Sequence, residues 1–166
     1  MTPSAKTPPT PGEAYSRLAD RCAMTEISTG EALEKLRRMG LRGPRAEAIV
    51  QRLVDERFID DERFARAWVR DRFGLARWGR RKIRESLILK RVDSAIIRQA
   101  LEEEIDPEAY YENLADALRS KARGMSEPLT REERMKLARF AASRGYEPDL
   151  IMEMIADEDY WRGETD

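Results

Sequence analysis

The residues best suited to chemistry form a basic stretch in the middle of the 166-residue chain. Eleven Lys or Arg lie between Arg63 and Arg91, against only Asp71 and Glu85. Such a stretch attracts phosphates or an acidic protein surface. The alternative is a solvated helix face that intramolecular ion pairs balance. Because eleven bases against two acids is too lopsided for local pairing, we expect a binding surface here.

Aromatic side chains interrupt this basic stretch, as in proteins that stack the bases of single-stranded nucleic acid. Trp68 follows Phe64 by four residues, the spacing of a buried helical stripe. Trp78 stands in a predicted turn and is the better candidate for an exposed stacking residue, although turns also tuck such rings onto a core. The candidate residues for binding a partner or nucleic acid are Arg63, Arg66, Arg70, Arg77, Trp78, Arg80, Arg81, Lys82, Arg84 and Arg91.

Acidic residues dominate the segments that follow. From Glu102 to Asp116 there are seven acids and no base, and from Glu147 onward there are eight acids against Arg162. Glu102, Glu103 and Glu104 would end a helix, where the macrodipole disfavours negative charge. We therefore expect a basic neighbour or a partner to compensate these glutamates.

Several kinds of catalytic site are absent from the sequence. There is no histidine, and Cys22 is the only cysteine, so His-dependent triads, zinc fingers with His ligands and an internal disulfide are excluded, whereas carboxylate-only metal chemistry stays open. No phosphate-binding glycine loop occurs. We predict no enzyme activity, no metal, no cofactor and no small-molecule substrate. An enzyme that uses only carboxylates, Arg and Lys would require these residues to converge in space.

Helix-start signals recur along the chain. Thr10, Asp60 and Asp106 are N-cap residues, and acids follow each of them in the first helical turn. Apolar pairs four residues apart mark a buried face at Ile49 and Leu53 and at corresponding places in the two later groups. Three groups of three helices result: Pro11–Ala23, Glu26–Met39 and Pro44–Glu56; Asp61–Phe73, Arg80–Lys90 and Ser94–Glu104; Pro107–Arg123, Arg131–Ser143 and Pro148–Asp157.

The pattern has a period of about fifty residues, because the pairs Ile97/Leu101 and Ile151/Ile155 repeat it. It predicts an all-α fold of three tandem three-helix, helix-turn-helix-like repeats in an elongated, curved array. The expected boundaries are a disordered arm at 1–9, repeats at 10–58, 59–104 and 105–158, and an acidic tail at 159–166. No segment spans a membrane or resembles a secretory signal, which predicts a cytoplasmic protein.

The central residues resemble the RecX family. The resemblance rests on Ile59-Asp60-Asp61-Glu62-Arg63-Phe64-Ala65-Arg66-Ala67-Trp68-Val69, on Gly79 to Leu87, and on Lys136 to Phe140 with Arg144-Gly145-Tyr146. It covers about residues 14–155. Arg91 stands where the family usually has glycine, and Arg80 where proline is common, so the turn after the middle helix is expected to close differently.

This resemblance implies a bacterial regulator that binds the RecA recombinase filament on single-stranded DNA. It would lie along the filament groove and suppress strand exchange, ATP hydrolysis and co-protease activity, with roles in DNA repair, homologous recombination and the SOS response. It also implies that the chain has no catalytic residues, and we expect a monomer. The competing hypothesis is a stand-alone, sequence-tolerant module for single- or double-stranded DNA.

Overall fold

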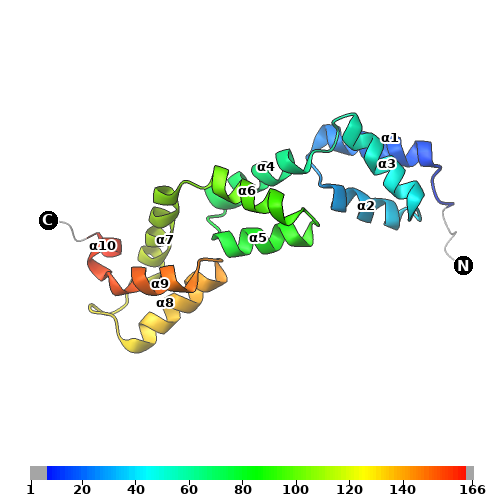
Figure 1. Cartoon of the computed structure of the whole chain (residues 1–166). Helices are drawn as coiled ribbons and strands as arrows, with labels where there is room; N and C mark the ends of the chain where they lie inside the picture. The colour runs from blue at the N-terminus through cyan, green and yellow to red at the C-terminus, as the bar shows by residue number, and fades with distance from the viewer. Residues whose placement is uncertain (1–6, 164–166) are drawn as a thin grey trace, which may run out of the picture. The chain divides into compact units, whose positions relative to one another are not determined.

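The computed structural model describes residues 7–163, which are helical without any strand in that range (Figure 1). The predicted all-α fold with three-helix repeats is confirmed. The nine predicted helices occur close to their expected bounds, and a tenth short helix was not predicted. The helices are α1 (Pro11–Met24), α2 (Thr29–Arg38), α3 (Pro44–Asp55), α4 (Asp61–Gly74), α5 (Arg80–Leu89), α6 (Ser94–Glu104), α7 (Pro107–Lys121), α8 (Arg131–Ser143), α9 (Pro148–Ala156) and α10 (Glu158–Arg162).

The contacts group these helices into two compact units. The first extends to Ala65 and includes Leu87–Ile96, so it holds α1 to α3 with the start of α4 and the α5–α6 turn. The second combines Arg66–Ser86 with the chain from Ile97 onward. The middle three helices therefore contribute to both units, and each unit is described by itself below.

Hydrogen bonds at the helix starts explain where several helices begin. The Thr10 hydroxyl accepts from the Glu13 N–H, and the Glu13 carboxylate accepts from the Thr10 N–H. Ser28 and Glu31 form the same reciprocal box at α2. Because Ser28 is the cap, α2 begins at Thr29, and the predicted start at Glu26 was wrong by three residues.

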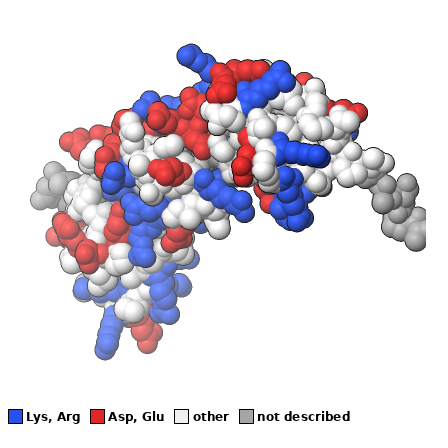
Figure 2. All heavy atoms as spheres, turned by 45° about the vertical axis from the view of Figure 1, so that its right-hand side comes forward, with Lys and Arg blue, Asp and Glu red and all other residues white. Residues whose placement is uncertain are grey.

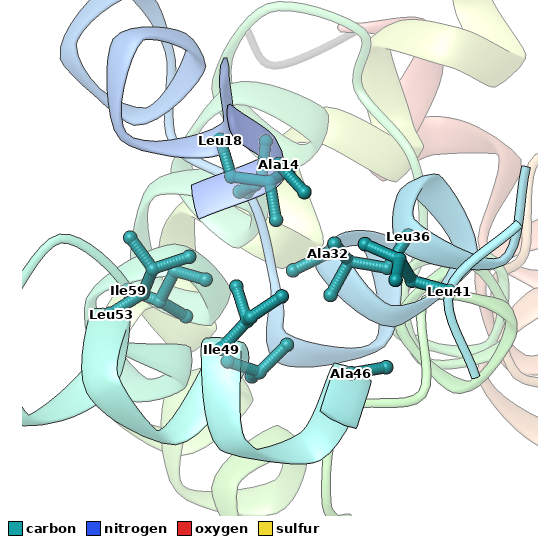
Figure 3. Packing of buried hydrophobic residues seen from close by; sticks show 11 residues of the cluster. Ala14, Leu18, Ala32, Leu36, Leu41, Ala46, Ile49, Leu53 and Ile59 are labelled. Atoms are coloured by element: carbon teal, nitrogen blue, oxygen red, sulfur yellow. The ribbon is translucent and has the colours of Figure 1, made fainter. Parts of the chain in front are cut away.

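The core of the first unit lies between α1, α2 and α3, whose apolar faces converge in Figure 3. The predicted pair Ile49 and Leu53 is buried there, together with Ile59 after α3. Burying a side chain of this size stabilises a fold by about 1.5–3 kcal/mol. The other labelled members of this core are Ala14, Leu18, Ala32, Leu36, Leu41 and Ala46.

Helix α10 begins in the same way as the first helices of the repeats. The carboxylates of Asp60, Asp106 and Asp157 each accept a hydrogen bond from the backbone N–H three residues later. Four residues after these caps stand the buried rings of Phe64, Tyr110 and Trp161. Helix α10 is thus a short third copy of this helix-start motif.

The predicted acidic tail at 159–166 is corrected by this finding. Trp161 is fully buried, and its carbonyl accepts a 2.7 Å hydrogen bond from the Arg119 side chain, so the segment packs onto α7 and α9 instead of trailing into solvent. Residues 1–6 of the predicted arm and 164–166 of the predicted tail lie outside the described residues.

A side-chain to main-chain hydrogen bond joins the start of α2 to the turn between α5 and α6 in the first unit. The Ser28 hydroxyl donates to the Lys90 carbonyl at 2.8 Å. A Cβ on Gly30 would lie 2.5 Å from the Cβ of Arg91, closer than two carbon atoms can approach. Arg91 has a φ of +56°, in the left-handed region that glycine favours, and the Val92 N–H donates to the Leu87 carbonyl as at the corresponding turns after α2 and α8. The expectation that this turn closes differently was therefore wrong.

Candidate partner-binding site

Within the described residues, six of the eleven bases from Arg63 to Arg91 pair with acids outside that stretch. These acids come from other helices and loops, so the local count of two acids overstated the open positive charge. Most of the pairs are exposed, and an exposed pair contributes only about 0–1 kcal/mol. The N···O distances are Arg63–Glu26 2.6 Å, Arg66–Glu103 2.5 Å, Arg70–Glu104 3.2 Å, Arg77–Asp116 3.2 Å, Arg80–Glu147 3.7 Å and Lys90–Glu31 2.5 Å.

Two of these pairs provide the expected compensation for the acidic end of α6. Arg66 and Arg70 lie one turn apart on α4 and reach Glu103 and Glu104. The basic neighbour is therefore another helix of the same repeat. On the face drawn in Figure 2, Lys and Arg side chains are interspersed with Asp and Glu.

The remaining bases include a cluster around Trp78, in the second unit. The Arg72 guanidinium carbon lies 4.0 Å from the ring centroid of Trp68 and 5.2 Å from that of Trp78. The Lys82 ammonium lies 4.4 Å from the Trp78 centroid. Both indoles are half-buried, so the predicted burial of Trp68 is only partly right. Cations over an indole contribute about 0.5–1 kcal/mol at exposed sites.

Arg81 and Arg84 extend this cluster along the first turns of α5. Both are exposed, and neither forms an ion pair within residues 7–163. Leu75, the first residue after α4, is 84% exposed and adds an apolar element. We call Arg72, Leu75, Trp78, Arg81, Lys82 and Arg84 the Trp78 surface. It combines positive charge, an aromatic ring and an apolar side chain, which suits an acidic protein surface or a nucleic acid strand.

Main-chain hydrogen bonds fix the loop that carries Trp78. The Trp78 N–H donates to the Arg72 carbonyl at 2.9 Å, and the Gly79 N–H donates to the Arg144 carbonyl at 2.7 Å. The Arg81 N–H donates to the Gly145 carbonyl at 3.0 Å. The start of α5 therefore docks onto the α8–α9 turn, much as the start of α2 docks onto the α5–α6 turn. The docking holds the Trp78 loop in one position.

Arg80 belongs to this docking contact. Its guanidinium carbon lies 3.9 Å from the Tyr110 ring centroid. The backbone N–H of Arg80 donates to the Tyr110 hydroxyl at 3.0 Å. The Tyr110 hydroxyl donates in turn to Glu147 at 2.6 Å. Burial is the main reason why the pKa values of Tyr110 and Tyr146 are raised, the latter to about 12. Arg80 is therefore less available to a partner than its place in the basic stretch indicated.

The ten predicted binding residues thus fall into three groups. Arg63, Arg66, Arg70, Arg77 and Arg80 are paired, whereas Trp78, Arg81, Lys82 and Arg84 belong to the Trp78 surface. Arg91 is exposed and belongs to the first unit, whereas the Trp78 surface belongs to the second. Sequence reasoning missed Arg72, although its position four residues after Trp68 on one helix was a usable signal.

Two further kinds of feature, a metal site and a membrane span, are absent from the described part of the chain. No group of three or more His, Cys, Asp or Glu side chains could hold a metal ion there. No helix among these residues has the length and apolar character needed to cross a membrane. Asp60 caps its own helix, as expected, but Asp61 accepts a 2.7 Å hydrogen bond from the Thr29 N–H at the start of α2.

Comparisons with known proteins agree on one family. Residues 60–101 match the model of the second three-helix domain of RecX, and residues 108–155 match that of the third. The regulatory protein RecX of Vibrio campbellii is 33% identical over 129 residues, which cover 78% of this chain and 81% of that protein. That of Xanthomonas axonopodis pv. citri is 38% identical over 127 residues, covering 76% and 75%.

Solved structures share the fold. The crystal structure of RecX from Lactobacillus salivarius superposes with a TM-score of 0.79 at 21% identity, covering 90% of this chain and 97% of that chain. A second crystal structure of a regulatory protein RecX gives a TM-score of 0.77 at 24% identity, covering 89% and 72%. With its repeated helix starts, its docked turns and these sequence matches, the chain belongs to the RecX family.

Proposed function

We propose that this protein binds the filament of the RecA recombinase and lowers its recombinase, ATPase and co-protease activities. The observation that carries the proposal is membership of a family whose members are named regulatory proteins. A chain of helical repeats offers many weak contacts to a periodic filament, and linked contacts of this kind bind more tightly than any one of them alone. Occupation of the filament groove would exclude partner DNA. The protein would act as a monomer in the cytoplasm.

We assign the main contact to the Trp78 surface. Arg81 and Arg84 are exposed and have no acidic partner in residues 7–163, so their charge is available without breaking an internal ion pair. The paired arginines would first have to leave their acidic partners within this protein before they could bind acids of the filament. They are Arg63, Arg66, Arg70, Arg77 and Arg80. Surface pairs are weak enough for such exchange, and these residues would contribute less than the Trp78 surface.

Direct binding of nucleic acid is the second candidate, and the cations around Trp78 favour it. A base stacked on an aromatic side chain contributes about 1–3 kcal/mol, and Lys or Arg nearby would neutralise phosphates. Gel shifts with single-stranded DNA in the absence of RecA separate the two functions. Tight binding that weakens steeply with salt supports the stand-alone module.

The test compares two charge-reversed double variants. Arg81→Glu with Arg84→Glu alters the Trp78 surface. Arg131→Glu with Lys136→Glu makes the same charge change on α8, where both residues are exposed. Arg80 is not used, because its loss would also break the contact with Tyr110 and Glu147.

The readout is ATP hydrolysis by RecA stimulated by single-stranded DNA, with co-sedimentation of the filament as a second measure. We expect the native protein to lower hydrolysis. The first variant should require roughly tenfold more protein for the same effect, the α8 variant less than about twofold more. Unchanged hydrolysis at saturating native protein contradicts the function. Equal potency of both variants contradicts the assigned surface.

A further inference from the structure

Three tyrosines in this protein donate a hydrogen bond to a glutamate from a distant part of the chain. Tyr15 donates to Glu56, Tyr110 donates to Glu147 at 2.6 Å, and Tyr160 donates to Glu112 at 2.5 Å. Each pair presents the face of a phenol ring beside a carboxylate. Such a pair can bind a cation through both the ring and the negative charge.

In the first two pairs an arginine occupies this position. The Arg52 guanidinium carbon lies 3.9 Å from the Tyr15 ring centroid, and its Nε donates to Glu56 at 2.8 Å. The Arg80 guanidinium carbon lies 3.9 Å from the Tyr110 centroid, and a terminal nitrogen lies 3.7 Å from Glu147. The same three-part arrangement of ring, carboxylate and guanidinium thus occurs in both compact units.

The third pair lacks its arginine. Among residues 7–163, no Lys or Arg lies over the Tyr160 ring or forms an ion pair with Glu112. Arg119 is nearby, but it pairs with Asp116 at 2.5 Å and donates to the Trp161 carbonyl. Tyr160 is 41% exposed, so its ring can be reached from solvent. The arrangement is therefore complete except for the cation.

An open pocket of about 460 Å³ lies at this incomplete pair. The Tyr111 ring meets the Tyr160 ring edge-on, with 5.5 Å between the centroids. Burial and the negative charges of Glu153 and Asp157 raise the pKa of Tyr111, which places further acids within electrostatic reach. Because its only charged lining side chains are acids, the pocket attracts cations and repels phosphates. Its lining residues are Pro107, Glu108, Tyr111, Glu112 and Tyr160.

We propose that the pocket at Tyr160 and Glu112 binds an arginine side chain of a protein partner, completing the arrangement that Arg52 and Arg80 complete elsewhere. Arginine fits better than lysine, because its planar guanidinium can stack on a ring and pair with a carboxylate at once. The acidic lining excludes nucleic acid as the occupant. This site is separate from the Trp78 surface and does not depend on the partner being the RecA filament.

The test is an NMR titration of the full chain with N-acetyl-arginine amide, compared with N-acetyl-citrulline amide. Citrulline has nearly the same shape without the charge. We expect saturable shifts of the Tyr111, Glu112 and Tyr160 signals with arginine amide, and shifts at least fivefold smaller with citrulline amide. A single exposed contact predicts a dissociation constant on the order of tens to hundreds of millimolar. Equal responses to both compounds, or no saturable shift, overturn the proposal.

Three variants locate the effect. Glu112→Gln should abolish the response, whereas Glu132→Gln removes an equal charge from α8 and should leave it unchanged. Glu108 lies four residues before Glu112, as Arg52 lies four before Glu56, so Glu108→Arg should occupy the site from within and block added arginine amide. A response that survives both Glu112→Gln and Glu108→Arg contradicts the assignment to this pocket.

Discussion

The contact between Gly79 and the α8–α9 turn allows a quantitative test of how the Trp78 loop is held. A Cβ at Gly79 would lie 2.3 Å from the carbonyl carbon and oxygen of Gly145 and 2.4 Å from the Tyr146 nitrogen. All three atoms belong to the backbone and cannot rotate away as a side chain would. The variant Gly79→Ala must therefore separate the start of α5 from the turn.

The expected loss follows from the bonds that this separation breaks. Three hydrogen bonds hold the contact: two are donated by the backbone N–H groups of Gly79 and Arg81 to the turn, and one by the Tyr146 hydroxyl to the Arg77 carbonyl. At about 0.5–1.5 kcal/mol each, they contribute about 1.5–4.5 kcal/mol. If the added methyl group were instead forced into the intact contact, the overpacking would cost about 1–3 kcal/mol, a similar amount. We expect Gly79→Ala to lower the free energy of unfolding by about 3 kcal/mol.

Gly74 provides the matched control, because a Cβ there would meet nothing within 4 Å. Gly74→Ala at the end of α4 should be neutral or stabilise by a few tenths of a kcal/mol. The assay is urea denaturation followed by circular dichroism, with amide hydrogen exchange at Arg81 as the local measure. If the two variants unfold alike and Arg81 keeps its protection, the main-chain docking does not hold the loop.

Three further perturbations test other features. Arg91→Gly should raise the free energy of unfolding by about 0.5–1 kcal/mol, since glycine adopts the observed φ of +56° without steric cost; a loss in urea denaturation would contradict this. Trp161→Ala should lower the free energy of unfolding by about 3–5 kcal/mol in the same assay, because the side chain is fully buried. A near-neutral result would contradict the packing of this segment onto the second unit. Backbone hydrogen bonds from Ser126 and Thr130 lower the pKa of Glu133 to about 2, so its stabilisation should be present above pH 4.5 and fade as pH falls toward 2; Glu133→Gln should remove that pH dependence in acid titrations of stability.

Much of the helical pattern could be read from local sequence. Thr10, Asp60 and Asp106 marked helix starts correctly, because a cap depends on bonds to residues only three positions away. The pair Ile49 and Leu53 marked a buried face for the same local reason. Helix α10 was not predicted, although Asp157 and Trp161 follow the spacing of the earlier caps, because acidic residues surround them.

The binding residues were harder to predict from the sequence. The count of bases located the region of the Trp78 surface, but it did not separate Arg81, which has no ion pair in the described residues, from Arg80, which stacks on Tyr110. Nor did it indicate that Tyr160 and Glu112 would meet. These distinctions depend on which helices lie side by side.

The sequence by itself determined nine of the ten described helices, several of their caps, their repetition and the family, because each of these depends on short spacings along the chain. Only the tertiary structure decided which charges are neutralised. Ion pairs and cation–aromatic contacts depend on distances of a few ångströms between residues dozens of positions apart. The folding of α4 against α6, and of α5 against the α8–α9 turn, therefore turned a uniformly basic stretch into a paired majority and a small set of exposed cations around Trp78.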